Sequence, residues 1–358
     1  MLEIWRAGGS NTGASPDLAR GVEAEGWDGQ MFMCSQNLSA DPYVQMGVWA
    51  SATTRLKLST GVTNPFTRNI AVTAAAAATV QAVSNGRAVL GIGRGDSALA
   101  YLGHAPVGLR QFETALKQLQ VLLSGGEIPF EEFGSSGDAP SVHELSLGDR
   151  PTAVALRWLP KDLPKVELDV AATGPRVIAM AARIAERVTF SVGADSGRME
   201  WALGTARAAR QALGEGDAGV SYGAQLVVIC HPDEQTAMEV AMQMAPPLAR
   251  FQVISGKKVG PTDQAADDNL EAVRTGYDMT KHGEIGAKDK IKGGPLSAEF
   301  VKNFAIVGPP DHCIERLLAL KKMGLERFVV VGPGFYPPGW GEAAGLFARE
   351  VMPAVRAG

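Results

Sequence analysis

Short apolar runs alternate along the whole chain with longer stretches of helical periodicity. Eight runs are rich in Val, Ile, Leu, Phe or Met, and we predict them as strands at residues 2–6, 29–34, 56–62, 87–92, 166–172, 187–192, 220–230 and 326–331. Between them, start and stop signals such as Pro16 and Gly26 predict helices at residues 16–25, 42–52, 70–84, 107–124, 175–185, 196–213, 309–323 and 341–355, with another after Asp233.

Eight strands separated by helices are the pattern of a (β/α)8 TIM barrel, which takes about 250 residues before insertions. The chain has 358 residues. We place roughly 100 extra residues in two insertions, an irregular one at about 125–165 with a short hairpin and a polar, partly helical one at about 247–300. We therefore expect residues 1–358 to form a single domain, although the length alone also allows two domains.

Residues 56–96 are the most informative segment, because they form a strand, an alanine-rich helix and a second strand. In such a unit both strands end at the same edge of the sheet, where parallel α/β folds bind ligands. The first loop is Gly61-Val62-Thr63-Asn64, and the second is Gly93-Arg94-Gly95-Asp96. Exposed backbone N–H groups beside a cation suit a phosphate or carboxylate. Because residues 173–175 have a similar composition, we predict one ligand site shared by these loops.

Other interpretations of these residues stay open. A dinucleotide fingerprint at residues 91–95 would need glycine where the chain has Asp96. The glycines could also serve only as tight turns, with Asp96 as the N-cap of a helix at 97–102. Trp5 could line a substrate cavity or fill the barrel interior. The charges in residues 288–292 resemble a solvated segment.

The composition of the chain limits the classes of molecule that we expect it to bind. A net charge of -4 gives no basic surface for nucleic acid. Three cysteines and five histidines are scattered, without the spacing of a disulfide framework or a metal site. The chain enters a strand at once, and its longest apolar stretch, residues 71–83, is too short for a bilayer. We expect a soluble cytoplasmic protein that acts on a small molecule, with no metal, membrane or nucleic acid.

At Gly61-Val-Thr-Asn-Pro-Phe-Thr-Arg68 and Val89-Leu-Gly-Ile-Gly-Arg-Gly-Asp96 the chain resembles the bacterial luciferase-like monooxygenase superfamily. It is most similar to the branch that contains the coenzyme F420-dependent methylenetetrahydromethanopterin reductases. Thr173-Gly174-Pro175 and Ile306-Val-Gly-Pro-Pro-Asp311 extend the resemblance. It covers most of the chain and is weakest in the two insertions.

The resemblance implies a TIM barrel that holds the deazaflavin F420, or alternatively FMN, at its carboxyl face, and it implies a homodimer or higher homo-oligomer. A non-prolyl cis peptide of relatives maps to Gly61–Val62 or to the next bond. The residues that the resemblance places at the cofactor are Gly61, Val62, Thr63, Asn64, Gly93, Arg94, Gly95, Asp96, Thr173, Gly174, Arg176 and Gly193. On the substrate side we place Trp5, Ser35 and Gln36.

Two departures from the family pattern bear on the reaction. Many relatives end strand two with Asp-His, and the reductases place a glutamate at the end of strand one. This chain has Cys34-Ser35-Gln36-Asn37 and Trp5-Arg6 there. We therefore assign no general acid or base and expect hydride transfer between F420 and a small molecule with an activated C=N, C=C or nitro group. An FMN-dependent monooxygenase using oxygen is the alternative, and a non-catalytic binding barrel is a third.

Overall fold

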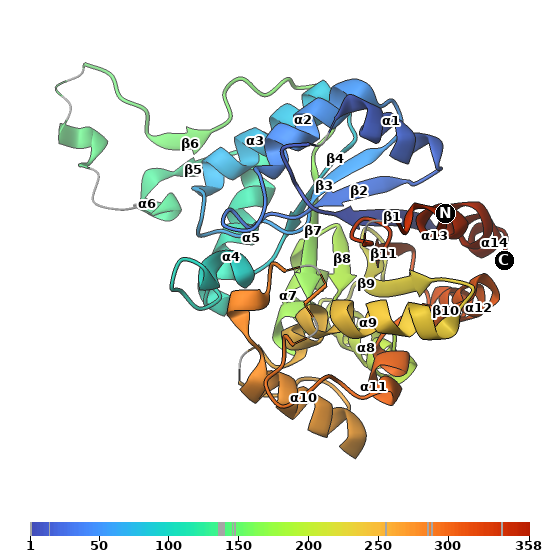
Figure 1. Ribbon diagram of the computed structural model, residues 1–358. Coiled ribbons are helices and arrows are strands. Elements are labelled where there is room, and N and C mark those ends of the chain that lie inside the picture. Colours follow the sequence, from blue (N-terminus) through green and yellow to red (C-terminus); the bar gives the residue numbers. More distant parts are fainter. Residues whose placement is uncertain are drawn as a thin grey trace.

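Eight parallel strands pair side by side around a closed ring (Figure 1). Their order is β1-β2-β3-β4-β7-β8-β9-β11, and β11 pairs with β1 to close the ring. Their bounds are β1 Glu3–Gly8, β2 Gly29–Phe32, β3 Lys57–Thr60, β4 Ala88–Ile92, β7 Glu167–Ala172, β8 Arg187–Phe190, β9 Ser221–Cys230 and β11 Arg327–Val331. The predicted TIM barrel is confirmed. The computed structural model describes residues 2–13, 15–134, 140–144, 146, 148–254, 256–284, 286–287, 289–337 and 339–358.

Helices follow the strands and surround the ring. The long ones are α1 Pro16–Ala24, α2 Pro42–Ala52, α3 Ile70–Val83, α5 Leu109–Leu123, α7 Pro175–Ile184, α8 Ser196–Gln211, α9 Glu234–Ala249 and α12 Pro310–Lys322. The C-terminal segment holds α13 Gly341–Leu346, a π-helical turn at Phe347–Val351 and α14 Met352–Ala357. Side-chain capping explains where several of these helices begin. Ser15 and Asp41 accept backbone N–H groups of the first turns of α1 and α2, each with Pro in that turn. Within the described part of the chain, no helix combines the length and apolarity needed to cross a bilayer.

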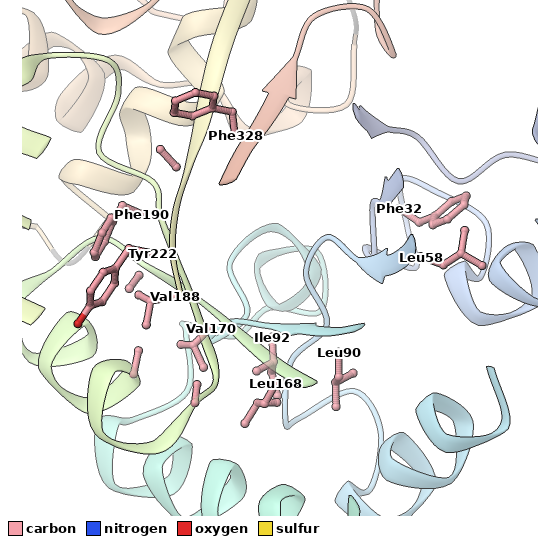
Figure 2. Packing of buried hydrophobic residues seen from close by; sticks show 14 of the residues in the cluster. Phe32, Leu58, Leu90, Ile92, Leu168, Val170, Val188, Phe190, Tyr222 and Phe328 are labelled. Atoms are coloured by element: carbon pink, nitrogen blue, oxygen red, sulfur yellow. The ribbon is translucent and has the colours of Figure 1, made fainter. Parts of the chain in front are cut away.

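Alternate residues of each strand point to opposite faces, and this divides the core into two layers. Leu168 and Val170 of β7 and Phe190 of β8 pack outward against the helices, and Figure 2 shows several side chains of this layer. A smaller cluster fills the barrel interior: Trp5, Ala7, Met31, Val89, Val329 and Val331. The outer layer therefore holds helices to strands, while the inner layer fills the part of the barrel below the strand ends.

Trp5 belongs to this interior cluster, and the substrate-side placement of Trp5 therefore needs correction. Only 1% of its surface is exposed, and its indole Nε1 donates to Glu3 Oε2 at 2.9 Å. Its ring meets β2 at Gly29, where a Cβ atom would lie 2.4 Å from the indole. Trp5 fills the barrel because it is an inward-pointing residue below the strand end.

Charged side chains close the amino-terminal end of the barrel. Arg187 at the start of β8 pairs with Glu3 of β1, and with Glu167 of β7 at 2.8 Å. Glu3 also pairs with Lys57 of β3 at 2.5 Å. The Arg187–Glu167 pair joins the neighbouring strands β8 and β7, whereas both contacts of Glu3 join strands that are not neighbours and so tie the barrel across its interior.

The two insertions differ in where they lie. The first holds the short strands β5 Glu127–Pro129 and β6 Ala153–Ala155, which pair antiparallel as the predicted hairpin, and α6 Phe130–Phe133. This segment extends away from the barrel in Figure 1, and residues 135–139, 145 and 147 lie outside the described residues. The second holds α10 Gln264–Gly276 and α11 Ala298–Phe304, with 3-10 turns at Arg250–Gln252 and Met279–Lys281. It is followed by an additional strand, β10 Ile306–Gly308, which pairs parallel with β9 and was not predicted.

Candidate active site

A cavity of about 650 Å³ lies at the carboxyl ends of the barrel strands. Loops that follow different strands each contribute to its wall. One residue from each such loop is named here: Gly9 after β1, Ser35 after β2, Val62 after β3, Gly93 after β4, Thr173 after β7, Ser191 after β8 and Gly334 after β11. This is the face on which TIM barrels carry their active sites, and it is the edge at which we predicted a shared ligand site.

The loop after β3 turns at Gly61 and Val62, and both residues line the cavity. The peptide bond between them is cis, which confirms the first of the two expected registers. The backbone then returns to β4, because Thr63 N donates to Gly91 O and Gly93 N donates to Thr63 O, each at 2.9 Å.

Thr63 and Asn64 were placed at the cofactor, but they lie behind the cavity wall. Thr63 is fully buried, and Asn64 is 1% exposed. The Asn64 carboxamide oxygen accepts the backbone N–H groups of Phe66 and Thr67, each at 3.0 Å. Asn64 therefore shapes the loop, because its side chain satisfies backbone donors and does not face the cavity.

The glycine loop after β4 lines the cavity with all four of its predicted residues, Gly93, Arg94, Gly95 and Asp96. Gly95 has φ of 76°, and a Cβ there would lie 2.9 Å from Asn64 Cβ, so this turn requires glycine. Asp96 occupies the N-cap position of the following helix, as one interpretation expected, but its side chain does not cap that helix. α4 spans Ser97–Ala100, and Asp96 makes no capping hydrogen bond to it but forms an ion pair with Arg250.

On the side assigned to a phosphate, the cavity wall includes Thr173 and Gly174 but not Arg176 or Gly193. Gly193 has φ of 82°, and a Cβ there would lie 2.6 Å from the Phe304 ring, so it serves the packing of α11 on the barrel.

Arg176 is exposed beside the cavity. Burial, and to a smaller extent the charge of Arg176, lowers the pKa of Arg94. The two guanidinium groups are therefore close enough to repel each other and to favour an anion.

Of the residues placed on the substrate side, only Ser35 lines the cavity. Gln36 is exposed, and its side-chain nitrogen donates to Ala98 O at 2.8 Å. Cys34 also lines the cavity, and burial raises the pKa of its thiol. Cys34 is therefore a neutral side chain of the wall at neutral pH.

Four polar side chains form the floor of the cavity, and we had not assigned them to the site from the sequence. Thr189 Oγ1 donates to Asp169 at 2.8 Å, and Ser191 Oγ donates to Gln225 Oε1 at 3.0 Å. All four side chains line the cavity from inside the barrel. Polar residues at alternate positions of otherwise apolar strands were the available signal, because an inward-facing strand position needs a polar partner or a ligand.

The second insertion forms a roof over the cavity and contributes residues that we had not assigned to it, including Phe251, Lys257, His282 and Lys290. The expectation of a solvated segment at residues 288–292 is wrong for Lys290. That residue is 5% exposed, and burial lowers the pKa of its ammonium group. Lys288 lies outside the described residues.

The arrangement suits an organic ligand with one anionic part. Apolar side chains such as Met31 and Val62 share the wall with the cations Arg94, Lys257 and Lys290. Among the residues that the structure describes, no group of three or more His, Cys, Asp or Glu side chains could hold a metal ion. The cavity can therefore bind, orient and enclose a ligand from side chains and backbone groups.

A closed (β/α)8 barrel with a cavity at its carboxyl edge is the architecture of TIM-barrel enzymes. The family model of luciferase-like monooxygenases matches residues 5–327, and the chain belongs to this family. The 5,10-methylenetetrahydromethanopterin reductase of Methanolobus tindarius is 25% identical over 93% of this chain and 94% of that protein. The F420-dependent glucose-6-phosphate dehydrogenase of Beutenbergia cavernae is 25% identical over 87% of this chain and 82% of that protein.

Solved structures share the fold over nearly the whole chain. The coenzyme F420-dependent tetrahydromethanopterin reductase from Methanopyrus kandleri aligns with a TM-score of 0.71 at 21% identity, over 98% of this chain and 99% of that chain. An F420-dependent secondary alcohol dehydrogenase, in complex with an F420-acetone adduct, gives 0.72 at 17% identity, over 99% of each chain. The oxygenating constituent of 3,6-diketocamphane monooxygenase from Pseudomonas putida, in complex with FMN, gives 0.64 at 17% identity, also over 99% of each chain.

Proposed function

We propose that this protein is an F420-dependent oxidoreductase. It transfers a hydride between the coenzyme and a small organic molecule with an activated C=N, C=C or nitro group. The observation that carries the proposal is the cavity at the barrel's carboxyl edge, walled by Gly61–Val62 and by the glycine loop 93–96. Its support comes from relatives over most of the chain, one named as F420-dependent, and from F420-dependent enzymes among the solved structures of the same fold.

The ring of a deazaflavin is planar and carries a pyrimidinedione edge with alternating acceptors and a donor. The cavity offers matching chemistry. Val62, Gly93 and Ala171 leave an apolar wall without bulky side chains, and a Cβ on Gly93 would already lie 3.0 Å from Val62 Cγ2. Ser191 and the Gln225 carboxamide supply hydroxyl and amide groups from the floor. These residues fit the ring.

The anionic side chain of the coenzyme needs cations or backbone donors. Arg94 and Lys257 line the cavity, and Arg176 lies beside it. Arg94 is held in place because its Nε donates to Val107 O at 2.6 Å. Among the described residues Arg176 makes no hydrogen bond or ion pair, so its charge is available to an anion. We place the anionic side chain against this cluster.

The coenzyme, when bound, supplies the hydride, and the protein supplies orientation and enclosure. Val62 supports one side of the ring position, and Phe251 of the roof covers part of the cavity. The chain has Ala7-Gly8-Gly9 at the end of β1 and Met33-Cys34-Ser35 after β2, and neither a carboxylate nor an imidazole is available there. We therefore favour acceptors that are already activated over alcohols, whose oxidation needs a base at the reacting carbon.

An FMN-dependent monooxygenase is the second candidate. The observation in its favour is the shared fold with 3,6-diketocamphane monooxygenase in complex with FMN. The two candidates differ in the cofactor, since only a reduced flavin supports oxygen insertion.

The test is a titration of the purified protein with oxidised F420 and, separately, with FMN, followed by fluorescence. We expect the deazaflavin to bind more tightly. Gly93→Leu fills the wall beside Val62 and should abolish binding. Gly108→Ala is the matched control, because a Cβ at Gly108 meets no atom within 4 Å and Gly108 lies outside the cavity wall. Micromolar FMN affinity without deazaflavin binding, together with substrate-coupled oxygen consumption, would contradict the proposal and favour the monooxygenase.

We also propose that the enzyme is a homodimer or a higher homo-oligomer. The adjacent helices α2 and α3 present exposed apolar side chains, with Val44 exposed to 69%, Val72 to 52% and Val48 to 39%. Such a face favours association with a second copy. Light scattering after gel filtration should give at least twice the chain mass, and Val44→Glu should lower it. A monomeric parent protein at micromolar concentration would refute this proposal.

A further inference from the structure

Three side chains form a continuous hydrogen-bonded chain at the roof of the cavity. The Tyr277 hydroxyl lies 2.6 Å from His282 Nδ1, and His282 Nε2 lies 2.6 Å from Ser97 Oγ. Ser97 follows the glycine loop of β4, whereas Tyr277 and His282 come from the second insertion. Ser97 and His282 line the cavity, and Tyr277 lies behind them. The insertion thus supplies an imidazole to a site whose strand ends lack one.

The surroundings keep this imidazole neutral. Burial, with the charges of Arg250 and Lys290, lowers the pKa of His282 to about 4. Arg250 also lies over the Tyr277 ring, 5.3 Å from its centroid, and is paired with Asp96. Burial raises the pKa of Tyr277, and Arg250 opposes that rise. At neutral pH the chain therefore consists of two hydroxyl groups joined by an imidazole with one N–H and one bare nitrogen.

Two directions of donation are possible through a neutral imidazole. Among the described residues, the Tyr277 hydroxyl has no hydrogen-bond partner besides His282. If His282 donated to Tyr277, the phenolic hydrogen would be left without an acceptor in a half-buried place, which is unfavourable. If Tyr277 donates to Nδ1, then Nε2–H donates to Ser97. The hydroxyl hydrogen of Ser97 is then free to point into the cavity, where a ligand can accept it.

We propose that the Ser97 hydroxyl is the proton donor to the substrate and that His282 and Tyr277 replenish it. This inference rests on the proposed function. The electrophilic carbon of a C=C or C=N group accepts a hydride from the reduced deazaflavin, and the π electron pair moves to the conjugated oxygen or to the nitrogen. That atom takes the Ser97 proton, Ser97 takes the Nε2 proton, and Nδ1 takes the phenolic proton. Arg250 stabilises the resulting phenolate, which water then protonates.

This proton relay from Tyr277 through His282 to Ser97 narrows the substrate class within the proposed function. An iminium group needs no proton on reduction, whereas a neutral C=N group or a carbonyl-conjugated C=C group needs one. A donor at Ser97 therefore favours a neutral, polarised acceptor. It also supplies the acid that is missing from the ends of β1 and β2.

The direction of the chain is tested without any cofactor. Nitrogen-15 spectra of the histidine-labelled protein report which imidazole nitrogen carries the proton, and His282→Gln assigns the signals. We expect a neutral His282 protonated on Nε2 at pH 7, and we expect Tyr277→Phe to remove this tautomer preference. A His282 protonated on Nδ1, or a charged His282 at pH 7, overturns the relay.

The reaction is tested with reduced F420 and cyclohexenone as the probe acceptor. Ser97→Ala should lower kcat by about 10²- to 10⁴-fold, the usual contribution of general acid catalysis, while F420 affinity stays within about twofold. Tyr277→Phe should slow the reaction less and change its solvent isotope effect, and Ser97→Thr should restore most of the rate. Tyr101→Phe is the matched control, because the Tyr101 hydroxyl donates to Met279 O at 2.5 Å and ties the same roof without joining the relay.

The outcomes separate the two proposals. An unchanged kcat in Ser97→Ala refutes the relay alone, and so does an equal loss in Tyr101→Phe and Tyr277→Phe. If the parent protein does not bind F420 or does not reduce cyclohexenone, the proposed cofactor or acceptor class is wrong. The tautomer of His282 then decides the relay by itself.

Discussion

Glu3 holds the amino-terminal end of the barrel through two cations, and its replacement tests how much that network stabilises the fold. Its carboxylate pairs with Arg187, whose side chain is 6% exposed, and with Lys57. Burial alone would raise the pKa of Glu3, but the two cations outweigh it and lower the pKa from 4.5 to about 2. At about 1.4 kcal/mol per pKa unit, ionised Glu3 stabilises the folded state by about 3 kcal/mol at neutral pH.

Glu3→Gln should therefore lower the free energy of unfolding at pH 7 by about 3 kcal/mol. Removing one partner of a buried pair costs about 3–5 kcal/mol in general, which agrees with this estimate. Because the pKa of Glu3 is lower in the folded state than in the unfolded state, its carboxylate stabilises the fold fully above pH 4.5. This stabilisation is lost as the pH falls toward 2. The difference between parent and variant should shrink to about 2 kcal/mol near pH 3.5.

The assay is urea unfolding followed by tryptophan fluorescence at both pH values. Glu167→Gln is the control, because Glu167 contacts the same Arg187 at 2.8 Å but is 49% exposed. Exposed pairs contribute about 1 kcal/mol or less, so this variant should lose less than Glu3→Gln. Equal losses in the two variants, or a difference that grows toward acid pH, would refute the reasoning.

Three further predictions follow from the cavity wall and the barrel. Arg94→Ala or Arg176→Ala should weaken cofactor binding about ten- to a hundredfold, and more so at low salt; unchanged affinity in both would make these arginines structural. Asp96→Asn removes the ion pair to the roof and should speed amide hydrogen exchange across residues 250–284, measured by mass spectrometry; unchanged exchange would contradict a holding role. Gly91→Ala places a Cβ 2.0 Å from a backbone oxygen of β3 and should destabilise by about 1–3 kcal/mol, whereas Gly47→Ala, inside α2 with no atom within 4 Å, should stabilise by about 0.5–1 kcal/mol in the same urea assay.

The strand and helix pattern was predictable because it is local. Apolar runs, prolines at helix starts and glycines at helix ends report on their own neighbourhood, and each of the eight barrel strands lies where it was predicted. The three-residue β10 was missed because so short a run carries no periodicity. The glycine loop 93–96 was also found, since backbone N–H groups next to a strand end need no distant partner to form a wall.

Side-chain direction was only partly predictable. We expected both Trp5 and Asn64 at strand ends facing a ligand, yet Trp5 lies within β1 and fills the barrel, and Asn64 satisfies backbone donors of its own loop. Asp96 resembled a helix cap, but Arg250, more than 150 positions away in the sequence, provides its partner. A charged side chain takes the partner that lowers its energy most, and a partner this distant in sequence is known only after folding.

By itself, the sequence determined the closed barrel, the edge at which its loops meet and the family to which the chain belongs. Tertiary structure decided which of the loop residues face the cavity, and it brought His282 and Lys290 from a polar insertion to its roof. The physical reason is the range of the interactions. Hydrophobic periodicity and backbone preference act within a few residues, whereas the roof is held by an ion pair and hydrogen bonds between segments more than 150 residues apart.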